Sequence, residues 1–183
     1  MTFKKIQVSK LDAARRQLDT AIDLWFHDGD PVSIHTLVFA AYEIIQDINK
    51  KKGNVDATLL GLIQRNVKSE HVEEVMKKMK KPMTFFKHAD RDPYGILEFQ
   101  PELSESFLYL AIIGFGELGE QTSNLVKVFV LWGSVHKPHL FLKDDNPIAS
   151  NLSAVQIENV RQLNKRGFLE ACMEGLAQVK IKC

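Results

Sequence analysis

The residues best suited to chemistry lie in the basic stretch from Lys77 to Pro93, which also holds two adjacent phenylalanines and a histidine. From Lys68 to Arg91 there are seven basic and four acidic residues, so the segment carries an excess of three positive charges. Clustered cations attract phosphates, and an aromatic face can stack an unpaired base. The alternative interpretation is that this stretch is the solvated end of a helix, with Phe85 and Phe86 buried in the core and no ligand bound. The residues that we expect to contact RNA are Lys77, Lys78, Lys80, Lys87 and Arg91.

His88 is the candidate general base of this stretch, because an ordinary imidazole titrates near neutral pH. Cleavage of RNA without a metal needs a base near the 2′-hydroxyl and a fixed cation beside the phosphate oxygens. We assign the cation to Lys81 or Lys87, a polar assisting role to Thr84, and the orientation of His88 to Asp90. This hypothesis requires the His88 ring to reach open space lined by cations.

Two segments resemble the HEPN family, whose name refers to nucleotide-binding domains of higher eukaryotes and prokaryotes. Residues 10–51 form an amphipathic helix pair with the run Ala40-Ala41-Tyr42-Glu43, and in residues 77–93 a histidine follows a basic stretch. Ribonucleases of this family carry an arginine, a polar residue and, a few residues later, a histidine. They complete this motif across a homodimer and cut RNA without a metal. The resemblance implies an all-α homodimer without a cofactor that binds RNA or a protein partner.

The motif departs from that of the family's ribonucleases at the arginine. Met83 stands where the arginine is expected, Thr84 fills the polar position, and Lys81 is the nearest upstream cation. Lysine cannot place two parallel hydrogen bonds on a phosphate, as arginine does. We therefore expect a binding protein whose metal-independent ribonuclease activity is weak or lost. The string Phe85–Pro93 is also similar to one in short bacterial proteins, which implies a bacterial source.

A metal-binding helical enzyme is the competing hypothesis, and a structural protein-interaction module without catalysis is a third. The spacing of the histidines does not indicate a metal site. Pro138 lies between His136 and His139, which predicts a loop, and no HExxH or Glu-x-x-His motif is present. The residues that would have to gather around a metal are His35, Glu43, His88, Asp90 and Asp92.

The run Gly114–Gly119 spells GxGxxG, the dinucleotide-binding fingerprint. That fingerprint needs a strand before it and a helix after it, within a βαβ unit. No alternation of strands and helices surrounds this run. We therefore predict that its glycines end one helix and allow the turn into the next.

Apolar residues recur at intervals of three and four along most of the chain, which predicts amphipathic helices. Pro82 is expected to interrupt the fourth helix and Gly167 the last, with loops at Arg91–Gly95 and Asp144–Pro147. No segment alternates with period two. The predicted fold is an all-α bundle with a four-helix core and additional helices, and the helices span residues 9–26, 30–51, 56–65, 69–79, 102–114, 123–135 and 153–179.

The composition is that of one soluble domain over residues 1–183, with 24 basic and 23 acidic residues and a net charge of +1. This balance excludes a strongly basic nucleic-acid-binding arm and an acidic tail. The two cysteines form no CxxC pair, which favours a reducing, cytoplasmic location. No signal peptide is evident, and the longest apolar run, Phe107–Phe115, is far shorter than a membrane span of about 20 residues.

Overall fold

The computed structural model describes residues 3–141 and 153–181, and within them it is an all-α bundle without strands, as predicted. None of the helices in these residues is long and apolar enough to cross a membrane. The α-helices are α1 (Lys10–Phe26), α2 (Pro31–Lys52), α3 (Leu59–Asn66), α4 (Val72–Lys87), α5 (Leu103–Glu117), α6 (Asn124–His136), α7 (Ala154–Arg161) and α8 (Lys165–Ile181).

The opening helix pair has the ends that its sequence predicts. The Ser9 hydroxyl caps α1 by accepting a hydrogen bond from the Asp12 N–H at 3.0 Å. Asp30 caps α2 in the same way through the Ser33 N–H at 2.8 Å, with Pro31 as the first helical residue. Gly53 ends α2 with a φ of 86°, a left-handed conformation that glycine adopts without steric cost.

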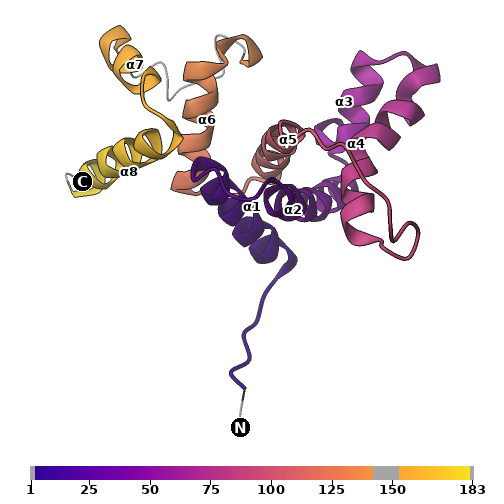
Figure 1. The fold of residues 1–183 in the computed structure, drawn as a ribbon. Helices are drawn as coiled ribbons and strands as arrows, with labels where there is room; N and C mark the ends of the chain where they lie inside the picture. The colour runs from indigo at the N-terminus through magenta and orange to yellow at the C-terminus, as the bar shows by residue number, and fades with distance from the viewer. Residues whose placement is uncertain (1–2, 142–152, 182–183) are drawn as a thin grey trace.

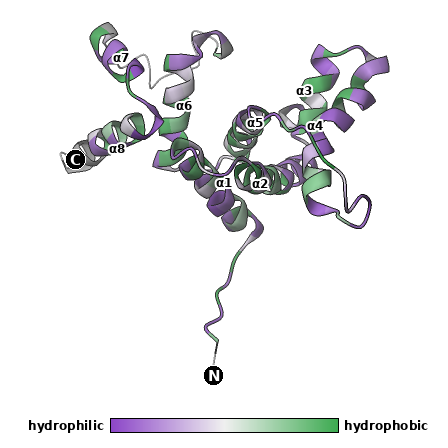
Figure 2. Cartoon of the chain, viewed as in Figure 1, coloured by the Kyte–Doolittle hydropathy of each residue, from purple (hydrophilic) through white to green (hydrophobic). Residues whose placement is uncertain are grey.

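Helix α2 lies at the centre of the bundle, between α1 and α5 (Figure 1). Hydrophobic residues gather along α5 and the facing sides of α1 and α2 (Figure 2). Most fully buried side chains come from α1, α2, α5 and α6, which form the four-helix core. Helices α3 and α4 pack together at one side of this core, and α7 and α8 contact α6 at the other.

Two predicted helix breaks are wrong. Helix α4 continues through Pro82 to Lys87, and Pro82 and Met83 are buried. The proline has no N–H to bond the preceding turn; we attribute the continuation to the burial of these two residues. The break in the last helical region falls before Gly167, because the Asn164 side chain accepts a hydrogen bond from the Gly167 N–H at 2.9 Å and starts α8. The loop predicted at Asp144–Pro147 lies outside the described residues.

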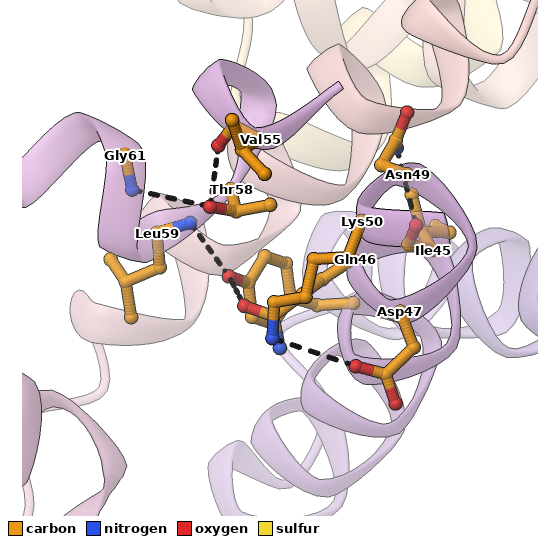
Figure 3. Close-up of polar contacts among 10 residues, drawn as sticks. Ile45, Gln46, Asp47, Asn49, Lys50, Val55, Thr58, Leu59 and Gly61 are labelled. Carbon is orange, nitrogen blue, oxygen red and sulfur yellow. Dashed lines mark hydrogen bonds and ion pairs between the residues drawn. The ribbon is translucent and has the colours of Figure 1, made fainter. Parts of the chain in front are cut away.

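Buried polar side chains fasten α3 and α5 to α2, and the contacts at the start of α3 are drawn in Figure 3. The Tyr42 hydroxyl donates to Gln46 Oε1 at 2.6 Å and accepts from the Leu59 N–H at 2.8 Å, at the start of α3. The Asn49 amide donates to the Gly114 carbonyl at 2.8 Å, where a Cβ on Gly114 would lie 2.8 Å from the Ile45 side chain. These bonds satisfy backbone groups that would otherwise be buried without a partner.

The GxGxxG run ends a helix, as predicted. Its first two glycines lie in the last turns of α5, and Gly119 follows the helix with a φ of 73°. No strand precedes this run in the part of the chain that the structure describes. The backbone there is thus a helix end followed by a turn.

Candidate nucleic-acid interface

Helix α4 carries four of the five predicted RNA-binding residues, Lys77, Lys78, Lys80 and Lys87, and is amphipathic. Its apolar residues, among them Val75, Met79 and Met83, are half-buried or buried. Residues three, four and seven positions apart share one side of a helix. The side opposite the apolar residues therefore presents a row that we call the basic face, made of Lys77, Lys80, Lys81, Thr84, Lys87 and, just beyond the helix, His88.

The middle of the basic face carries positive charge that no carboxylate neutralises by direct contact. Lys77, Lys80 and Lys81 form no ion pair with any residue that the structure describes. By contrast, Lys78 contacts Glu74 at 2.7 Å, and Lys87 contacts Glu43 of α2 at 3.3 Å. The acidic residues of α4 lie in its first turn, at the positive end of the helix dipole. The lysines lie further along, toward the negative end, so both kinds of charge are favourably placed.

His88 is open to solvent, with 44% of its side chain exposed. Its Nδ1 lies 3.8 Å from Asp90 Oδ1, which is longer than a hydrogen bond. Lys81 precedes His88 by seven residues, or about 10 Å along the helix axis, and Thr84 lies between them on the same side. The structure thus brings Asp90 near His88 and aligns Lys81, Thr84 and His88 along one face, while Arg91 lies exposed in the loop that follows.

The two adjacent phenylalanines have different surroundings, although both are half-buried. The Phe86 ring packs against His35 at 5.9 Å and Phe99 at 5.3 Å between ring centroids. The Phe85 ring contacts Phe86 edge-on at 6.1 Å and, by helical spacing, flanks Lys81. Phe86 therefore supports the core, and Phe85 is the aromatic residue beside the basic face.

His35, one of the candidate metal ligands, is fully buried in the core. Its Nδ1 lies 3.2 Å from the Ser104 hydroxyl, and its Nε2 has no hydrogen-bond partner among the described residues. Burial lowers the pKa of His35 to about 4, so the ring is neutral at pH 7. Across residues 3–141 and 153–181, no group of three or more His, Cys, Asp or Glu side chains is placed to hold a metal. The five candidate metal donors are not brought together.

Sequence reasoning missed a cavity of about 260 Å³ where the start of α5 and the start of α8 meet the turn between α1 and α2. At its edge, the Lys165 ammonium lies 2.9 Å from Asp28 Oδ1 and 4.1 Å from the centre of the Trp25 ring. Glu105, which also lines the cavity, pairs with Lys137. These residues come from distant segments, so no local pattern could reveal them. Because these charges are already paired, the cavity offers less to an anion than the basic face does.

Comparison with known proteins finds no matching family model, no similar curated protein and no similar solved structure.

Proposed function

We propose that this protein is a HEPN-like helical protein that binds RNA through the basic face of α4. One observation carries the proposal, namely that the exposed Lys77 and Lys81 and the half-buried Lys80 have no ion-pair partners among the described residues. Phosphate groups are the ligands that such a row attracts best, because binding them releases counterions from the nucleic acid.

The charge of the whole chain, +1, is too small to attract nucleic acid by itself, so the attraction is local to α4. Phe85 borders the lysines, and its half-buried ring is an aromatic surface against which an unpaired base can stack. A single strand, whose bases are accessible, fits this combination of cations and an aromatic ring better than a duplex does.

Replacing Lys77, Lys80 and Lys81 with glutamine is expected to weaken the binding of single-stranded RNA roughly 100-fold at 0.1 M salt. Each lost phosphate contact removes about 0.7 from the slope of log affinity against log salt, so the slope should fall by about 2. Fluorescence anisotropy of a labelled oligonucleotide, titrated with protein at several salt concentrations, measures both quantities.

The matched control replaces Lys52, Lys127 and Arg166 with glutamine, because all three are exposed cations without an ion pair among the described residues and lie on α2, α6 and α8. This variant should bind RNA as the unmodified protein does. Equal losses in the two variants would mean that only the net charge matters, and the proposal for α4 would then be wrong. No binding by the unmodified protein at low salt would also exclude it.

The same preparation tests whether bound RNA is cut. Cleavage at the basic face would depend on His88, which has no metal site beside it in the described residues. We therefore expect any cleavage to persist in chelator and to disappear in His88→Ala, while RNA binding stays within about threefold because one imidazole adds little to the phosphate attraction. Cleavage that chelator abolishes would favour the metal-dependent hypothesis. Intact RNA would limit the function to binding.

A further inference from the structure

A groove of about 460 Å³ lies between α6, α7 and α8, the helices on the side of the bundle away from α4 (Figure 1). We call it the α8 groove. Its apolar residues are buried or half-buried, and they come from all three helices: Val128, Leu131, Val160, Cys172 and Leu176. Burial raises the pKa of the Cys172 thiol to about 11. Clefts of this size with mainly apolar walls commonly hold small molecules.

The α8 groove carries positive charge at a single point. Among the described residues that line it, only Lys127 is charged, and this exposed side chain forms no ion pair with any of them. Lys127 also lies one turn into α6, near the positive end of the helix dipole, which itself attracts an anion.

No acidic side chain of these helices faces the groove. Helix α6 has no acidic residue. Helical spacing places Glu158 of α7 and Glu170 and Glu174 of α8 on the far sides of their helices from the residues that line the groove. The charge of Lys127 is therefore left to a ligand or to solvent.

Two amides of α7 line the same groove as Lys127 and have free donors. The Gln156 Oε1 accepts hydrogen bonds from the Ser153 N–H at 2.9 Å and the Ser153 hydroxyl at 3.0 Å, within the cap of α7. The amide nitrogens of Gln156 and Asn159 donate to no acceptor among the described residues. One cation and two amide donors are suited to a carboxylate.

The charge and the apolar floor lie along an elongated path. The Phe168 ring, at the start of α8, packs against Trp132, near the end of α6, at 5.0 Å between centroids. Helix α8 therefore runs back along α6, so that Leu176 lies toward the start of α6, where Lys127 is. The groove thus has a cation at one end and adjoins packed aromatic rings at the other.

We propose that the α8 groove binds a free medium-chain fatty acid, with its carboxylate at Lys127 and its alkyl chain over Val128, Leu131 and Cys172. A fatty acid matches the groove because it has one negative charge at one end and is apolar elsewhere. The proposal does not depend on RNA binding, since α6, α7 and α8 are distinct from the basic face.

Calorimetric titration of the full chain with fatty acids of increasing length tests the proposal, each used below its micelle concentration. From hexanoate to decanoate the affinity should rise about fourfold for each added methylene, because each one is buried in the groove. Equal affinity for hexanoate and decanoate, or no saturable binding of decanoate up to about 1 mM, would overturn the proposal.

The role of Lys127 is tested by comparing decanoate with the uncharged decanol. Decanol should bind about tenfold more weakly to the unmodified protein, because it lacks the charge-assisted hydrogen bonds. Lys127→Gln should remove this difference by weakening decanoate alone. A preference for decanoate that survives in Lys127→Gln would contradict the placement of the carboxylate.

Gly175→Phe is expected to block the groove without disturbing the fold. Gly175 lines the groove, and a Cβ at this position would meet no atom within 4 Å. The variant should bind decanoate at least about tenfold more weakly, because the new ring occupies the place of several methylenes. Gly116→Phe is the matched control, since this exposed glycine of α5 also has open space at its Cβ and lies outside the groove. Equal binding by both variants would contradict the site.

The reactivity of Cys172 locates the ligand independently of affinity. In protein with Cys183→Ser, saturating decanoate should slow the alkylation of Cys172 by N-ethylmaleimide at least about tenfold, because the chain covers the thiol. An unchanged rate beside measurable binding would place the ligand elsewhere. Protection that rises with protein concentration in the absence of decanoate would assign the groove to a second copy of the chain and overturn the proposal.

Discussion

Phe107→Ala is expected to lower the free energy of unfolding by about 4 kcal/mol, the loss that removal of a buried phenylalanine typically causes. Phe107 lies on α5 and is completely buried. Its ring centroid is 4.8 Å from that of Phe39, 5.3 Å from Tyr42 and 5.6 Å from His35, all on α2. The substitution leaves a cavity between the two central helices, where the neighbouring rings cannot close in without leaving their other contacts.

Urea unfolding followed by circular dichroism measures this loss. Tyr94→Ala is the matched control, because it removes an aromatic ring that is 93% exposed and should change the stability by no more than about 0.5 kcal/mol. A loss below about 1.5 kcal/mol for Phe107→Ala would mean that the contact between α2 and α5 is not the centre of the core.

Lowering the pH from 7.5 to 4 is expected to remove about 3 kcal/mol of stability through His35 alone. The ring lies among Phe39, Phe86, Phe99 and Phe107, and burial lowers its pKa in the folded state to about 4, against about 6.5 in the unfolded chain. Between these two values the unfolded chain binds a proton that the folded protein does not. Stability therefore falls by about 1.4 kcal/mol per pH unit as the pH drops through this window.

The difference between the unmodified protein and His35→Gln isolates this effect, because paired carboxylates contribute to both proteins alike. Glutamine can donate a hydrogen bond to Ser104 as His35 can, but it does not titrate. The variant should be less stable at pH 7.5 and should lose about 3 kcal/mol less on acidification. Unfolding measured in urea at intervals of half a pH unit provides both curves. Parallel curves would show that His35 is protonated as readily in the folded protein as in the unfolded chain.

The ends of several helices could be predicted from sequence because they depend on local chemistry. Ser9, Asp30 and Gly53 act on backbone groups within four residues of themselves, so their types and positions are sufficient. Pro82 and Gly167 were misjudged for the opposite reason. Each has a poor local preference for helix, but tertiary burial of Pro82 and Met83 and the Asn164 cap outweigh it.

The sequence by itself determined that lysines cluster in and after a helix expected at residues 69–79. Lys81 and Thr84 share one face with Lys77 because α4 continues through Pro82, which its local preference opposes. Only the tertiary structure decided which charges remain without partners and which rings are buried. The Lys87–Glu43 pair spans 44 positions, and the aromatic residues around His35 come from α2, α4, α5 and the segment before α5. Such contacts depend on how the helices pack, because electrostatic pairing and burial act over a few ångströms in space and not along the chain.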